Sequence, residues 1–154
     1  MNEDLLKEIE TYISNLTGRT FIKSVAIEDT AINIFFFESY NEFKSSNIDS
    51  PISNSDYDDY FASQSSVEKL LVGESVRILR EFGHLNNVGI VLPVKANIYE
   101  ISVSRERLNS FLGYNVDTLS TLNDTWRSKF ADVFIYNKAN RERFLKEFVQ
   151  KYLN

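Results

Sequence analysis

The side chains best able to do chemistry lie together in the stretch Asp56-Tyr57-Asp58-Asp59-Tyr60. Closely spaced carboxylates of this kind can ligate calcium or magnesium. An EF-hand loop counted from Asp56 needs glycine at its sixth position and glutamate at its twelfth, where this chain has Phe61 and Val67. We therefore expect no metal site. We interpret the stretch as a solvated loop or as the contact surface for a protein partner, with the candidate residues Asp56, Tyr57, Asp58, Asp59 and Tyr60.

Other catalytic groups are scarce. The chain has no cysteine, which excludes thiolate nucleophiles, cysteine-based zinc sites and iron–sulfur clusters. Its one histidine, His84, follows the predicted helix stop Gly83 and is interpreted as a capping or loop residue. No glycine-rich phosphate loop and no G-x-S-x-G motif occurs. We assign no catalytic residue, no metal and no cofactor, and a hydrolase that uses Asp and Glu side chains stays as an alternative.

Aromatic residues offer a second candidate site. The chain has 12 Phe, 8 Tyr and 1 Trp, and Phe35-Phe36-Phe37 is the densest cluster. Because strand side chains alternate between the two faces of a sheet, this run is typical of a central strand buried on both sides. The alternative is a pocket for a small apolar ligand between the sheet and its helices. Its expected lining is Phe35, Phe37, Ile98, Tyr99 and Trp126.

The elements that position these residues follow a repeated layout. At an offset of 65 residues, Leu5 falls on Leu70 and Gly18 on Gly83, although other positions do not match. Such an offset is typical of a repeated supersecondary unit. We interpret it as a helix followed by two strands, occurring twice.

Apolar periodicity predicts a single α+β domain, residues 1–154. Two αββ units would form one antiparallel sheet of about four to five strands, with helices packed on it and a C-terminal helical tail. A capping-box pattern, Ser65 with Glu68, predicts the start of the second unit's helix. The expected segments are αββ units at 3–43 and 66–112, an acidic loop rich in Ser, Asn and Asp at 39–65, and an αβα tail at 114–154 with a strand at 132–136 and a last helix at 138–153.

The second face of this predicted sheet is too apolar to be left in water. Phe35 and Phe37 alternate with the residues of the first face. Large exposed apolar patches are rare on soluble proteins unless they bind something. We therefore expect the C-terminal tail to cover this face.

Composition limits location and partners. The net charge of -5, with both signs spread along the chain, disfavours nucleic acid, which needs a basic patch. No apolar run approaches the roughly 20 residues that span a bilayer, so we expect no membrane association. The absence of cysteine and the acidic N-terminus favour a cytoplasmic protein. The many Asn, Ile, Lys and Phe residues suggest a bacterial or phage gene.

These observations favour a non-catalytic function. We expect a small cytosolic protein-binding or adaptor protein whose partner is another protein, with a homodimer left open. Two alternatives remain, a small apolar ligand-binding protein with an aromatic pocket and a carboxylate-dependent hydrolase.

Overall fold

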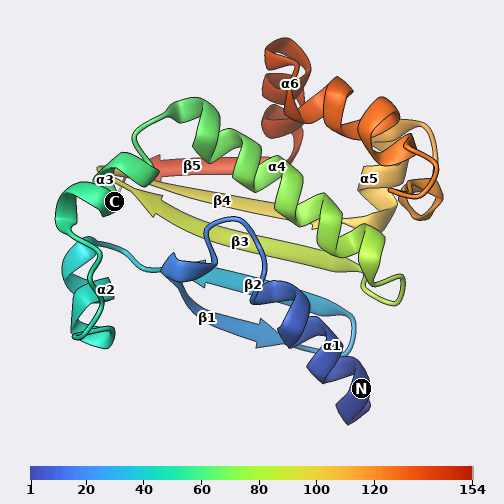
Figure 1. Cartoon of the computed structure of the whole chain (residues 1–154). Helices are drawn as coiled ribbons and strands as arrows, with labels where there is room; N and C mark the ends of the chain where they lie inside the picture. The colour runs from blue at the N-terminus through green and yellow to red at the C-terminus, as the bar shows by residue number, and fades with distance from the viewer. Residues whose placement is uncertain (154) are drawn as a thin grey trace.

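The computed structural model describes residues 1–153 and confirms the predicted α+β class. A helix followed by two strands occurs twice, as α1-β1-β2 and α4-β3-β4 (Figure 1). The elements are α1 (Glu3–Ile13), the 3-10 turn η1 (Arg19–Phe21), β1 (Ile22–Ile27), β2 (Ala31–Phe36), α2 (Tyr40–Ser46), α3 (Asn54–Tyr60), α4 (Gln64–Glu81), β3 (Asn87–Val94), β4 (Asn97–Ser104), α5 (Arg105–Leu112), the 3-10 turn η2 (Val116–Thr118), the π-helix η3 (Trp126–Ile135), α6 (Lys138–Phe148) and β5 (Val149–Leu153).

The strands of residues 1–153 form one sheet in the order β1-β2-β3-β4-β5. Neighbours pair antiparallel except β2 and β3, which are parallel, with Ala31 opposite Asn87 and Phe35 opposite Val91. The sheet is therefore mixed rather than wholly antiparallel as expected. The reason is that α4 carries the chain back along the sheet before β3 begins, and a crossover of this kind joins parallel strands.

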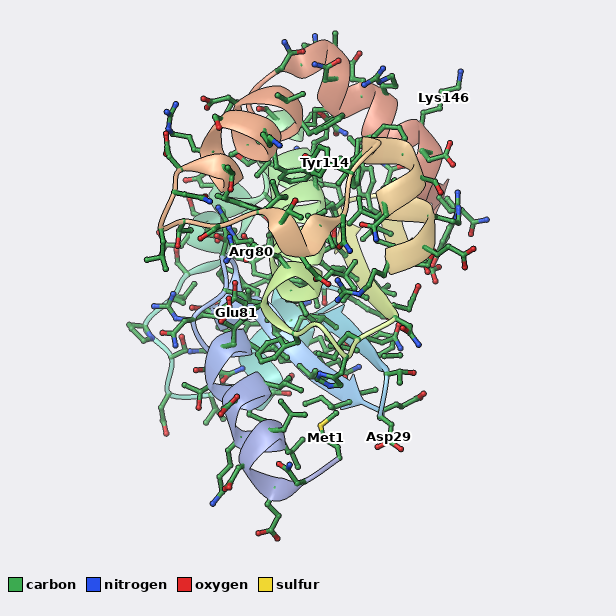
Figure 2. All side chains as sticks on the ribbon, turned by 90° about the vertical axis from the view of Figure 1, so that its right-hand side faces the viewer. Met1, Asp29, Arg80, Glu81, Tyr114 and Lys146 are labelled. Carbon is green, nitrogen blue, oxygen red and sulfur yellow. The ribbon has the colours of Figure 1, made fainter. Side chains whose placement is uncertain are left out.

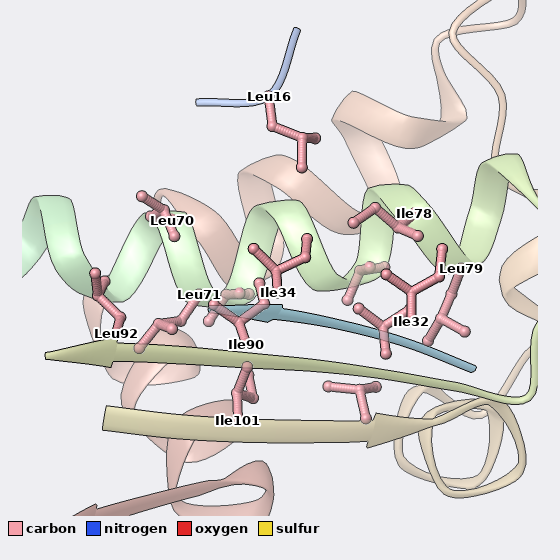
Figure 3. Packing of buried hydrophobic residues seen from close by; sticks show 14 of the residues in the cluster. Leu16, Ile32, Ile34, Leu70, Leu71, Ile78, Leu79, Ile90, Leu92 and Ile101 are labelled. Atoms are coloured by element: carbon pink, nitrogen blue, oxygen red, sulfur yellow. The ribbon is translucent and has the colours of Figure 1, made fainter. Parts of the chain in front are cut away.

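One face of the sheet, hereafter the inner face, packs against α1, α4 and α6. The strand register places Ile34, Ile90 and Ile101 in one row across β2, β3 and β4, and none of the three is more than 1% exposed. Leu71 and Ile78 of α4 lie above this face (Figure 3). Removal of these side chains from water is the main force that holds the helices to the sheet.

The opposite face, hereafter the outer face, is not covered by a helix along most of β2 to β5 in the described chain; at the end near α2 and α3, Pro93 of this face is buried beside them. Phe35 is 37% exposed there and Tyr152 is 42% exposed. The register places the following residues on this face: Ser24, Ala26, Ala31, Asn33, Phe35, Asn87, Gly89, Val91, Pro93, Ile98, Glu100, Ser102, Ser104, Gln150 and Tyr152.

The prediction that the C-terminal tail covers this second face is wrong, because the tail lies on the inner side. Leu145 of α6 lines one hollow together with Leu71 of α4 and Tyr99 of the inner face. Phe144 and Phe148 of α6 belong to the buried core. The inner face is apolar at almost every position, whereas the outer face intersperses Ser, Asn and Gly, so covering the inner face buries more apolar area.

Residues 39–65 contain α2 and α3 rather than the expected loop. Aromatic rings hold them against one end of the sheet, where the Phe21 ring centroid lies 5.2, 5.0 and 5.6 Å from those of Phe43, Tyr57 and Phe61. The Ser53 side chain caps α3, and Asp56 completes the capping box. Ring packing and capping hydrogen bonds therefore give this polar segment a defined structure.

The tail at 114–154 also departs from the expected αβα order. The predicted strand at 132–136 lies mostly within η3, where Phe130 and Phe134 share one buried side. A short apolar run does not distinguish a strand from a buried helix. The predicted helix at 138–153 ends at Phe148, and Val149–Leu153 pairs with β4 as β5.

The start of α4 is shifted from its predicted cap. The Ser63 hydroxyl, not that of Ser65, accepts the N–H of Ser66 at 3.3 Å. The carboxylate of Glu68 accepts a hydrogen bond from Arg141 of α6 at 2.9 Å instead of closing a capping box. Both side chains of this ion pair are largely buried, so it joins α4 to α6 across the core.

Candidate functional site

A cleft of about 750 Å³ lies between α1 and α4. Its volume falls within the range of roughly 300–1,000 Å³ that is typical of ligand sites. The lining combines charged, hydroxyl, amide and aromatic side chains from the two helices and the loop after α1: Lys7, Glu8, Thr11, Tyr12, Asn15, Leu16, Thr17, Glu74, Arg77, Glu81 and Phe82.

Helical periodicity brings these side chains to facing sides of α1 and α4. Residues three or four apart lie on one side of a helix, as do Glu74, Arg77 and Glu81 of α4. The rings of Tyr12 and Phe82 meet edge to face across the cleft, with centroids 5.5 Å apart. Burial raises the pKa of the Tyr12 hydroxyl. As a phenol, this group can donate or accept a hydrogen bond.

The cleft continues along α4 into a second hollow of about 270 Å³. The two share Thr17, Glu74 and Arg77. Their lining along α4 and its C-cap runs from Ser66 to Phe82, which corresponds to a length of about 24 Å at roughly 1.5 Å per residue. We name the combined cleft and hollow the α4 groove; the second hollow adds Ser66, Lys69, Leu70, Ile135 and Tyr136 to its lining.

An ion pair between Glu74 and Arg77 occupies the middle of the α4 groove. Glu74 is only 3% exposed, and its carboxylate accepts a hydrogen bond from the Arg77 guanidinium. Burial raises the pKa of the Glu74 carboxyl, although Arg77 and Thr17 act in the opposite direction. The Arg77 side chain is 32% exposed, so water weakens its attraction to the carboxylate. The pair fixes two charged side chains on one side of α4 at the floor of the groove.

Trp126 lies beneath two arginines beside the α4 groove. The guanidinium carbons of Arg77 and Arg80 are 5.4 and 4.6 Å from the ring centroid of Trp126, within the range of cation–π attraction. Figure 2 shows Arg80 and its neighbour Glu81 between α1 and the C-terminal helices. Trp126 is the only tryptophan of the chain, so its fluorescence reports on this part of the protein.

The predicted partner-binding residues at 56–60 all lie in α3, but in different environments. Tyr57 is buried, and burial raises its pKa to about 12. Asp56 accepts the backbone N–H of Ser53 at 3.0 Å, which lowers the pKa of its carboxyl. Asp58 and Asp59 are exposed, and Tyr60 is 40% exposed while its ring packs on Phe21. Asp56 is exposed as well, so four of the five predicted residues are presented to solvent and only Tyr57 is buried.

The five residues expected to line an apolar pocket are not brought together. Phe35 and Ile98 lie on the outer face, whereas Tyr99 lies on the inner face and donates a hydrogen bond to Gln64 at 3.0 Å. Phe37 is buried beside Phe43 of α2 at the end of the sheet. Trp126 belongs to η3 and lies against Arg80 of α4.

Sequence reasoning missed Glu74, Arg77 and the groove around them. One signal was present, because Glu74 falls between Leu70 and Ile78 on the buried side of α4, at a position where the periodicity calls for an apolar residue. A buried charge is almost always paired, so a charge in an apolar stripe indicates a nearby partner. The i+3 residue Arg77 supplies it.

No family model, no curated protein and no solved structure matches this chain. Comparison with known proteins therefore assigns no role to the residues of the groove. Among residues 1–153, no group of three or more His, Asp or Glu side chains is placed to hold a metal ion. No helix in that same range has the length and apolarity needed to cross a membrane.

Proposed function

We propose that this chain is a non-catalytic protein-binding domain and that the α4 groove receives a polypeptide segment of a partner protein. The observation that carries the proposal is the continuity of the cleft and the second hollow along about 24 Å of α4. An extended peptide rises roughly 3.3 Å per residue, so about seven residues would span this length. A long, open groove suits a polypeptide better than a small molecule, because a small-molecule site usually buries most of the ligand's surface.

The chemistry of the lining supports the same class of ligand. Tyrosine and arginine are the side chains most enriched in protein interfaces, and the groove presents Tyr12, Tyr136 and Arg77. Tyr136 is 62% exposed at the rim, with the Lys69 ammonium 5.4 Å from its ring centroid. Acidic and basic groups occur along the whole groove, which disfavours a ligand of one charge sign such as nucleic acid.

The proposed setting remains the bacterial or phage cytoplasm, supported by the cysteine-free composition. The exposed Asp58, Asp59 and Tyr60 of α3 are proposed as a secondary contact surface. The hydrolase and the small apolar ligand-binding protein gain no specific support from the geometry.

Selection of displayed random peptides, longer than about seven residues, on the immobilised full chain tests the proposal. Enriched peptides should change the fluorescence of Trp126 on binding. They should also bind Tyr136→Ala at least about tenfold more weakly, because truncation of an interface tyrosine at a hot spot costs roughly 2 kcal/mol or more.

Leu122→Ala is the matched control, since Leu122 is 97% exposed and lies outside the groove. Both substitutions remove an exposed side chain and should leave the thermal unfolding temperature almost unchanged. Failure to enrich any peptide, or equal affinity of the enriched peptides for both variants and the wild type, would contradict the proposal.

A further inference from the structure

The outer face of the sheet carries an apolar stripe that no element of residues 1–153 covers. Phe35 pairs with Val91 across β2 and β3, and Ile98 pairs with Tyr152 across β4 and β5. Val91 and Ile98 are diagonal neighbours, because Val91 of β3 lies opposite Glu100 of β4 and Ile98 lies two residues before Glu100 on β4. We name these four residues, Phe35, Val91, Ile98 and Tyr152, the outer stripe.

The outer stripe is not needed to close the core. Phe35 and Tyr152 are 37% and 42% exposed, and the face around them is formed by small or neutral residues such as Ser24, Asn33 and Ser102. A sheet face left open to water is normally polar at most positions. Burial within the monomer therefore does not explain why four adjacent strands carry a row of four apolar side chains on this face.

Charge is nearly absent from the outer face. Among the residues that the register places there, Glu100 is the only charged one in the described chain, and it accepts a hydrogen bond from Tyr152 at 3.2 Å. Charged residues make up 25% of the sequence as a whole. Depletion of charge is the compositional mark of the centre of a protein interface. A neutral face of this kind gives a charged partner nothing to recognise.

We propose that the outer face binds the outer face of a second copy of this chain. Two identical acidic molecules repel each other through most of their surfaces, and the outer face, where Glu100 is the one charged residue of the described register, is where two copies can meet with the least repulsion. Most soluble homo-oligomers are two-fold symmetric dimers in which the same patch meets itself. A two-fold axis that runs along the outer stripe places each stripe residue over its counterpart and puts the two Glu100 carboxylates on opposite sides of the axis.

The available area places this association among weak interfaces. The five strands described here, at a spacing of about 4.8 Å and a length of about six residues, give a footprint on the order of 500 Å² per copy. The total of roughly 1,000 Å² lies at the lower limit for a specific interface. Interfaces at this lower limit are typically weak and transient, so we expect a dimer in exchange with the monomer and a dissociation constant of roughly micromolar order or weaker.

Sedimentation of the full chain over a concentration series from about 1 to about 500 μM, which brackets this expected dissociation constant, tests the inference. The mean mass should rise from 17.9 kDa toward twice that value. Ile98→Glu places a charge in the middle of the outer stripe and should keep the mass at that of the monomer. Leu122→Glu makes the same kind of change at a site that is 97% exposed and away from the sheet, and it should dimerise like the wild type.

Phe35→Ser provides a second stripe variant at an already exposed position, should Ile98→Glu fail to fold. It should shift the midpoint of association to at least about tenfold higher concentration. A wild-type chain that stays monomeric at the highest concentration overturns the inference, as does a dimer that both stripe variants leave unchanged. The α4-groove variant Tyr136→Ala should dimerise normally, which separates this inference from the proposed peptide binding.

Discussion

The inner and outer faces of the sheet are made by the same strands, yet the inner face is buried and the outer face is accessible. On the inner face, Ile34, Ile90 and Ile101 are sealed beneath α4. On the outer face, Val91 and Ile98 lie among residues that are neutral except for Glu100, and both remain partly accessible. The contrast shows which apolar residues folding explains and which it leaves free for another molecule.

The largest expected difference between the two faces is in stability. Ile90→Ala removes a fully buried side chain and should lower the free energy of unfolding by about 2–5 kcal/mol. Val91→Ala, one residue along the same strand, should cost about 1 kcal/mol or less, since Val91 is only partly buried. Urea unfolding of dilute protein measures both. Equal losses would mean that the outer face is as deeply buried as the inner one.

The next largest effect concerns the close packing of the loop after α1 on the inner core. Gly18 has a φ of 83°, and a Cβ there would lie 3.0 Å from Leu70 Cδ1 and 3.1 Å from Phe36 Cε2. Gly18→Ala should destabilise the fold by about 2 kcal/mol, because the left-handed conformation alone costs an L-residue roughly 1–2 kcal/mol. Gly83→Ala is the control, with nothing within 4 Å of the added Cβ. Its unfolding free energy should change by no more than about 0.5 kcal/mol.

A smaller, pH-dependent effect should arise from Glu74, on the helical side of the sheet. Burial raises its pKa in the folded state, so between the unfolded and the folded pKa the native protein binds more protons than the unfolded chain. Stability should therefore fall as the pH rises through this window. Glu74→Gln lacks this titration, and the stability of the wild type relative to the variant should decline with increasing pH. A relative stability that increases with pH would show that Arg77 outweighs burial.

The smallest effect is expected at Tyr57, in the aromatic cluster that closes one end of the sheet. Its hydroxyl donates a long hydrogen bond to the Phe37 carbonyl at 3.4 Å, so Tyr57→Phe should cost no more than about 1 kcal/mol. Phenolate absorbance should show one tyrosine of the wild type titrating with a pKa of about 12, and this component should be missing from the variant. A variant with an unchanged titration curve would place another tyrosine in this environment.

The regular alternation of strand residues is what made the sheet predictable. Ile90 and Leu92, together with Tyr99 and Ile101, marked β3 and β4 because their period of two has no helical equivalent. The run at 132–136 is only five residues long, and its Phe134 follows Phe130 by four residues, a spacing that fits a helix as well. The outer face was beyond sequence reasoning, since an apolar residue at a strand position does not reveal whether another element lies above it.

The site was harder to predict than the fold. The conspicuous acidic stretch at 56–60 directs attention to α3. There Tyr57 is buried in the core, and the Asp56 side chain takes part in the capping box of the helix. The α4 groove joins side chains from α1, α4 and η3 that are more than 100 residues apart in the chain. Only their placement in space relates them, so no spacing rule could identify the groove.

Thiol labelling tests the contrast between the two faces most directly, because the chain has no cysteine of its own. Ser102 is exposed on the outer face, and Val103, the next residue of β4, is fully buried on the inner face. In dilute native protein, a maleimide should modify Ser102→Cys almost as fast as it modifies the same variant in denaturant. It should modify native Val103→Cys at least about a hundredfold more slowly than denatured Val103→Cys. The reason is that the reagent reaches position 103 only through a local opening that costs several kcal/mol. Equal protection of both positions would contradict the account, because it would mean that the chain itself covers the outer face.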